Sequence, residues 1–155
     1  MPANTIAVTL ESRKNVADLR KTGIHPEHWY PLARSRDIKS GKAIGKSFAG
    51  ESIVLVRTAS GKIFALEDRC AQRQVPLHAG VVNGEQIQCC YHGWVYDSNG
   101  SCVNIPYAGK NERIPHSVRS YPCKEAYGLI FVFPGDRNKA EDAFFPHIPA
   151  KEDRH

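Results

Sequence analysis

The sequence predicts an all-β domain built from antiparallel hairpins. Three pairs of apolar runs within residues 52–105 are each joined by a turn signal: Ser60-Gly61, Asn83-Gly84 and Asn99-Gly100. Glycine at such a turn takes up the positive φ that short hairpin loops need. Because three hairpins follow one another so closely, we expect the strands to pair with their neighbours in the chain.

The elements follow in a regular order. The first expected strand is Trp29–Ala33, which Pro31 would confine to an edge because proline has no N–H to donate. Further strands are expected at residues 52–57, 62–67, 81–82, 86–88, 94–96, 102–105, 117–121 and 128–133, the last two as a pair.

The ends of the chain differ in character from the middle. Val16, Leu19 and Arg20 lie at helical spacing before Gly23, which predicts a short N-terminal helix. We therefore divide the chain into an N-terminal helical preface (1–28), a β domain (29–135) and a charged, proline-bearing C-terminal arm or linker (136–155).

Composition limits the possible functions. With 155 residues, 41% of them hydrophobic and 24% charged, the chain is long enough for one domain with a real core. The net charge of +5 is modest and the basic residues are dispersed, which argues against nucleic-acid binding. No apolar run approaches the roughly 18 to 20 residues of a membrane helix, and residues 1–10 do not resemble a signal peptide. We expect a cytoplasmic protein without membrane contact.

The five cysteines point to metal chemistry. Their number is odd and two are adjacent, which does not suit a disulfide framework. In a reducing compartment, cysteine is more often used for metal binding or catalysis. Cys102 falls in an expected strand and Cys123 lies two residues beyond one, and both are interpreted as core residues.

Two segments at the ends of hairpins carry the candidate ligands. The first runs from Cys70 to Gly80, and the second is Cys89-Cys-Tyr-His-Gly-Trp94. Cys89 and His92 form a C-x-x-H pair, which allows a thiolate and an imidazole to face one metal centre from a tight loop.

Together the two segments resemble the cluster-binding loops of a Rieske domain. In that family, loops of the form C-x-H and C-x-x-H bind a [2Fe-2S] cluster, with two cysteines on one iron and two histidines on the other. The resemblance implies that Cys70, Cys89 and His92 are metal ligands. The residues that it implies around the cluster are Pro76, Tyr91, Gly93 and Trp94.

The resemblance extends over Trp29–Gly135 and favours one subclass. Segments 29–34, 61–70, 91–106 and 121–135 look like the N-terminal domain of Rieske non-heme iron, aromatic-ring-hydroxylating oxygenases. Rieske proteins of respiratory chains would have a disulfide cysteine at Tyr91 and a serine at Trp94, and neither is present. The implied fold is a Rieske-type set of antiparallel sheets with a cluster-binding subdomain of two hairpin loops.

The implied function is electron transfer. Such a domain passes electrons from a reductase or ferredoxin toward a mononuclear iron catalytic domain, and no two-His, one-carboxylate constellation for that iron follows Pro146. The chain is therefore interpreted as the redox component of a Rieske mono- or dioxygenase that does not hydroxylate by itself. The alternatives are a stand-alone Rieske-type ferredoxin and a cluster-free structural domain.

One position departs from the family pattern. Gln72 stands where the family has its first histidine ligand, and an amide oxygen is a poor ligand for iron in a sulfide cluster. Three outcomes follow: a missing or labile cluster, a cluster held by Gln72, water or a rearranged ligand, or another metal bound by Cys70, Cys89 and His92. Cys90 and His78 are the nearby substitute ligands.

Overall fold

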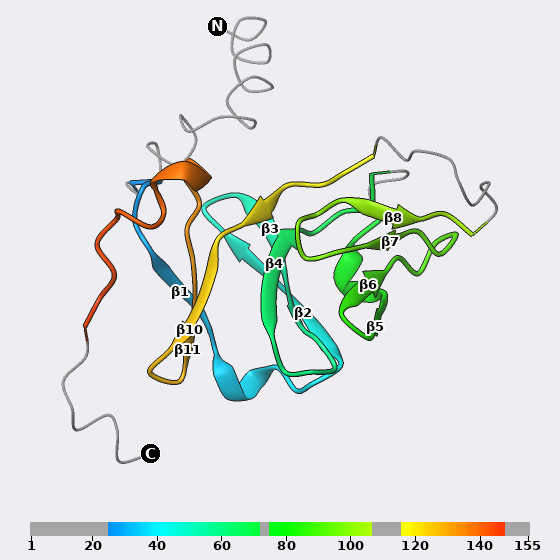
Figure 1. Ribbon diagram of the computed structural model, residues 1–155, viewed down its shortest axis with the longest axis horizontal. Helices are drawn as coiled ribbons and strands as arrows, with labels where there is room; N and C mark the ends of the chain where they lie inside the picture. Colours follow the sequence, from blue (N-terminus) through cyan, green and yellow to red (C-terminus); the bar gives the residue numbers. More distant parts are fainter. Residues whose placement is uncertain (1–24, 72–74, 107–115, 148–155) are drawn as a thin grey trace, which may run out of the picture.

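The computed structural model describes residues 25–71, 75–106 and 116–147 (Figure 1). These residues form three antiparallel sheets and three short 3-10 helices, with no longer helix among them. The all-β prediction is therefore confirmed. The expected N-terminal helix falls in residues 1–24, outside the described residues. None of the described helices is long and apolar enough to cross a membrane.

The central sheet has the strand order β2-β3-β4-β9. Its strands are β2 (Lys42–Phe48), β3 (Glu51–Arg57), β4 (Ile63–Glu67) and β9 (Ser120–Tyr121). Four consecutive residues of β3, Ile53–Val56, are completely buried because this strand is covered on both faces. Ile53 and Leu55 face one core, whereas Val54 and Val56 face another. An uninterrupted apolar run is what a strand between two layers requires.

The second sheet packs on the Ile53 and Leu55 side of β3. It has the order β1-β11-β10 and consists of β1 (Tyr30–Arg34), β10 (Cys123–Ala126) and β11 (Leu129–Val132). β1 is at an edge, as Pro31 predicts, and the 3-10 helix η1 (Ser35–Asp37) follows it. Ile130 and Val132 of β11 complete the core that this sheet shares with β3.

One sequence-based pairing needs correction, and two strands were missed. The expected hairpin of 117–121 with 128–133 does not form: β9 pairs with β4, and β11 pairs with β1 and β10. Strands β2 and β10 were not expected at all. The tight turn before β11 is Tyr127-Gly128, where both residues have positive φ, and it joins β11 to β10.

The third sheet forms a separate lobe on the Val54 and Val56 side of β3 (Figure 1). Its order is β5-β6-β7-β8, and the 3-10 helix η2 (Leu77–Ala79) precedes it. The strands are β5 (Val81–Asn83), β6 (Gln86–Gln88), β7 (Val95–Tyr96) and β8 (Cys102–Asn104). This lobe contains the segment Cys89–Trp94, and its hairpins lie where the two Asn-Gly pairs predict them.

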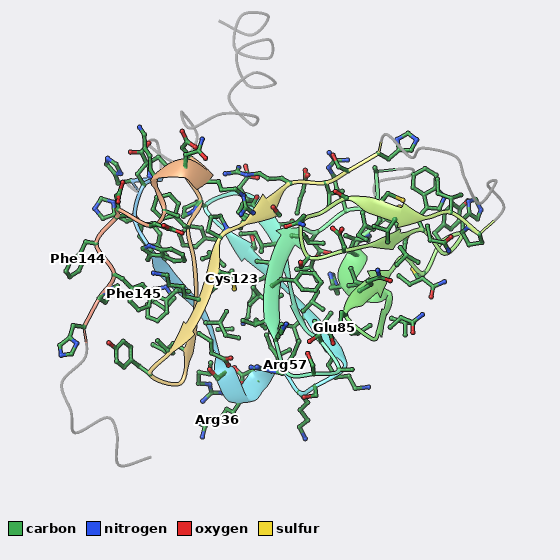
Figure 2. All side chains as sticks on the ribbon, viewed as in Figure 1. Arg36, Arg57, Glu85, Cys123, Phe144 and Phe145 are labelled. Carbon is green, nitrogen blue, oxygen red and sulfur yellow. The ribbon has the colours of Figure 1, made fainter. Side chains whose placement is uncertain are left out.

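The first part of the predicted C-terminal arm packs on the outer face of the second sheet. After η3 (Arg137–Lys139), Phe145 contacts the Trp29 and Phe131 rings, with centroids 5.7 and 4.8 Å away. The Trp29 indole N–H donates to the carbonyl of Ala140 at 3.1 Å. Figure 2 shows Phe145 toward the sheet and Phe144 pointing away from it. Residues 136–147 are thus packed against the β domain.

Candidate metal centre

Two main-chain hydrogen bonds shape the candidate loops. Cys70 follows β4 by three residues, and its N–H donates to the carbonyl of Val75 at 2.7 Å. Cys89 directly follows β6, and its N–H donates to the carbonyl of Trp94 at 2.7 Å. Each cysteine is therefore fixed at the start of a loop by a rigid strand and a closing hydrogen bond.

The two thiols are brought together in the core between the central sheet and the lobe. Cys70 is 1% exposed and Cys89 is 2% exposed, and both belong to the same packed cluster. Burial raises the pKa of the Cys89 thiol above its ordinary value, and a hydrogen bond with Cys70 raises it further. A metal ion bound between the two thiols would favour their deprotonated form, because its positive charge stabilises the thiolates.

Tyr96 connects the first loop to β7. Its side chain is fully buried, and its hydroxyl accepts a hydrogen bond from the Ala71 N–H at 2.9 Å. The same hydroxyl lies 3.3 Å from the Cys70 sulfur. When Cys70 is a thiolate, the Tyr96 O–H must be the donor, because the sulfur then has no proton. The Tyr91 N–H also reaches a sulfur, that of Cys89, at 3.4 Å.

His92 lies at the exposed tip of the second loop. It has a φ of +71° and Gly93 has a φ of +73°, so two successive residues adopt the left-handed conformation. That conformation is uncommon for a residue with a Cβ and reverses the chain within the loop. The imidazole is exposed, and the Tyr91 ring is stacked on it with centroids 4.1 Å apart.

The residues expected around the cluster differ in exposure. Trp94 is buried, whereas Tyr91 is 40% exposed and Pro76 is also exposed. A Cβ at Gly93 would lie 3.2 Å from Pro106, so the glycine allows this proline to approach the second loop.

The proposed ligands divide into two groups. Within residues 25–71, 75–106 and 116–147, no three His, Cys, Asp or Glu side chains gather closely enough to hold one metal ion. Cys70 and Cys89 lie in one packed core, and His92 is exposed on the loop that begins at Cys89. Thiolate and imidazole are the two donor types that bind the irons of a Rieske cluster, so the chemistry of these three side chains suits such a group.

The fourth expected ligand position is residue 72, and the substitute ligands considered for it are Cys90 and His78. Gln72 lies outside the described residues. Cys90 is exposed, unlike its buried neighbour Cys89. The His78 ring contacts Asp68 and belongs to η2. The contact of His78 with Asp68 was not predicted, because a pairing across ten residues has no periodic signal in the sequence.

Comparison with known proteins shows what the chain is similar to. Residues 28–122 match the model of the Rieske [2Fe-2S] domain. The chain is 39% identical over 137 residues to a 4beta-methylsterol monooxygenase of Methylococcus capsulatus, covering 86% of this chain and 37% of that protein. It is 40% identical over 114 residues to a putative toluene-4-sulfonate monooxygenase iron-sulfur subunit of Comamonas testosteroni, covering 72% of this chain and 32% of that one.

Solved structures give the same result. Dicamba monooxygenase bound to dicamba superposes with a TM-score of 0.73 at 32% identity, covering 79% of this chain and 36% of that one. A chain from the reduced complex between oxygenase and ferredoxin in carbazole 1,9a-dioxygenase gives 0.63 at 32% identity, covering 71% of this chain and 29% of that one. The chain thus spans about a third of the length of the relatives it matches.

Proposed function

The chain belongs to the Rieske [2Fe-2S] domain family, and on that premise we propose that it is the electron-transfer domain of a Rieske-type oxygenase. It would receive electrons from a ferredoxin or reductase and pass them toward a mononuclear iron domain. The observation that carries this proposal is the buried pair of thiols, Cys70 and Cys89, beside an exposed histidine on the same loop as Cys89. The similarity of the chain to several oxygenases, one of them solved in complex with a ferredoxin, supports the choice of partners.

Cys70 and Cys89 would hold one iron and His92 the other. A bound [2Fe-2S] cluster supplies one-electron redox chemistry at a potential set by its ligands and by hydrogen bonds to its sulfurs. With both cysteines as thiolates, the Tyr96 hydroxyl would donate to the Cys70 sulfur and the Tyr91 N–H to the Cys89 sulfur. Both donors stabilise negative charge on those sulfurs.

Burial and exposure give the two ligand groups different roles. The core around Cys70 and Cys89 excludes water and lowers the local dielectric, which protects a cluster and influences its potential. His92 and the stacked Tyr91 ring are exposed at the tip of the loop. We propose that this tip is where the electron leaves the domain for a partner.

We further propose that Gln72 impairs this centre. The remaining ligands and their surroundings suit a Rieske cluster, but an amide in place of an imidazole is a weak ligand for the second iron. The effect would be poor retention of the cluster rather than loss of the fold, because the cores described above are built by other residues.

The test is to load the full chain and its Gln72→His variant with iron and sulfide in parallel. Gln74→His is the matched control, because it adds a histidine to the same segment at a position that is not a family ligand. Iron and acid-labile sulfide per chain, visible absorption and the EPR spectrum of the reduced protein are measured. We expect two irons, two sulfides and a Rieske-like signal from Gln72→His alone.

The other outcomes have definite meanings. If the unaltered chain also gives a full Rieske signal, another group binds the second iron and the proposed impairment is wrong. If neither the chain nor Gln72→His binds a cluster, the electron-transfer proposal fails and a cluster-free domain takes its place.

A further inference from the structure

A buried carboxylate joins the two ends of the first ligand loop. Asp68 follows β4, and its side chain is only 4% exposed. One carboxylate oxygen accepts from the His78 main-chain N–H at 2.8 Å, and the other is 2.5 Å from the His78 ring Nδ1. The Asp68 N–H donates to the carbonyl of Ser52 in β3 at 3.0 Å. Asp68 therefore ties η2 to the central sheet.

The neighbouring strand leaves room for this pair only because it has a glycine there. A Cβ added to Gly45 in β2 would lie 2.5 Å from the His78 Nδ1 and 3.0 Å from the nearer Asp68 oxygen. Both distances are too short for ordinary contacts. The sequence thus provides three features for one junction: a buried acid, a histidine with two donors and a gap in the adjacent strand.

Cys70 lies inside the span that this junction connects. It follows Asp68 by two residues, and its own N–H is hydrogen-bonded to Val75, three residues before His78. A buried carboxylate without hydrogen-bond partners is destabilising, so opening the Asp68–His78 contact would cost free energy. Keeping it closed holds the main chain on both sides of Cys70 against the central sheet.

We propose that Asp68 and His78 are positioning residues that hold the Cys70 sulfur in its buried place opposite Cys89. The importance of that place rests on the proposed function of Cys70 as an iron ligand. The effect of Asp68 and His78 on the place of the Cys70 sulfur does not require a cluster. It can be measured on the protein after any cluster has been removed.

The experiment measures how fast iodoacetamide alkylates Cys70. The full chain is treated anaerobically with a reductant and a chelator, and alkylation of each cysteine is followed by peptide mass spectrometry. A thiol that is 1% exposed reacts only when the structure opens locally, so its rate reports that opening. Cys123, a partly buried residue of β10 that packs against the core between the second and central sheets, is the internal reference.

Two variants break the junction by different routes. His78→Ala removes the ring, and Gly45→Ala displaces it without altering either partner. In both we expect Cys70 to react about tenfold faster or more, whereas the Cys123 rate changes less than about twofold. His78→Asn keeps a side-chain donor for Asp68 and should restore most of the protection. Arg34→Ala, which breaks the exposed Arg34–Asp37 pair, is the control for loss of a salt bridge elsewhere.

Two results would overturn the proposal. An unchanged Cys70 rate in both variants means that the junction does not position this sulfur. Equal acceleration of Cys70 and Cys123 means that the variants only destabilise the whole fold, and a thermal melt of each variant checks this. Neither result depends on whether the chain binds a cluster, so a failure of the proposed function would be recognised separately.

Discussion

Replacing Tyr96 by phenylalanine removes a single oxygen atom from the centre of the candidate site. The ring is fully buried, so the change leaves the packing in place and removes only the polar contacts of the hydroxyl. Those contacts are the Ala71 N–H at 2.9 Å and the Cys70 sulfur at 3.3 Å. The hydroxyl is thus the link between β7 and the first ligand loop.

The cost follows from the group that is left without a partner. In Tyr96→Phe the Ala71 N–H loses its hydrogen-bond acceptor in a partly buried position. An unsatisfied donor of this kind costs about 1–3 kcal/mol, and we expect a loss of about 2 kcal/mol in the free energy of unfolding. For a chain of this length the melting temperature should fall by about 4–8 °C.

Urea denaturation followed by circular dichroism measures this loss. Tyr30→Phe is the matched control, because its hydroxyl donates to the His25 carbonyl at 2.6 Å in an exposed position. There water replaces the lost partner, so the change should stay within about 0.5 kcal/mol. The reasoning is refuted if both variants lose the same stability, or if Tyr96→Phe is as stable as the unaltered chain. In cluster-loaded Gln72→His protein, Tyr96→Phe should also lower the reduction potential, because one donor to a ligand sulfur is lost.

Three further predictions concern the scaffold. Phe145→Ala should cost about 1–2 kcal/mol in chemical denaturation because the ring packs on the second sheet, whereas Phe144→Ala, 76% exposed, should stay within about 0.5 kcal/mol. Burial raises the pKa of Cys123 to about 12, so folding favours its protonated form and the free energy of unfolding falls as the pH rises above the ordinary pKa of a thiol. Between pH 8 and 10 this fall should be about 1 kcal/mol, a loss that Cys123→Val abolishes. Gly100→Ala should be poorly folded in a thermal melt, because its methyl group would lie 2.2 Å from a main-chain carbonyl oxygen, whereas Gly84→Ala, in an equivalent Asn-Gly turn with open space, should cost about 1 kcal/mol.

The hairpins were predictable because their signals are local. The Asn99-Gly100 pair and the alternation beside it specify both a turn and the strands that it joins. β2 was missed because Gly45 interrupts it and all seven of its residues are at least partly exposed. The pairing of β9 with β4 was missed because it depends on which strand the folded sheet leaves open, and the sequence around Ser120 does not specify its partner.

The candidate ligands were proposed from a signal of the same local kind. Cys70, Cys89 and His92 stand at fixed spacings within short loops, so a linear pattern is enough to single them out, and their role as ligands stays a prediction. The contact of Asp68 with His78 has no such pattern, because it depends on how η2 returns to the end of β4. Candidate ligands can thus be proposed from spacing alone, whereas a contact such as Asp68–His78 is visible only in the folded arrangement.

The core around Cys70 and Cys89 determines how Gln72→His should affect the melting temperature. The hydrophobic core that contains Cys70 and Cys89 is completed by side chains of β3, β4, β6 and β7, such as Val54, Leu66 and Ile87. These contacts bury both thiols, and residue 72 is not among them. We therefore expect the chain and Gln72→His to have the same melting temperature when both are cluster-free, and to differ once iron and sulfide are supplied. A stabilisation that appears only on loading measures the binding of the cluster itself, because a ligand that binds the folded state alone raises its stability in proportion to occupancy and affinity.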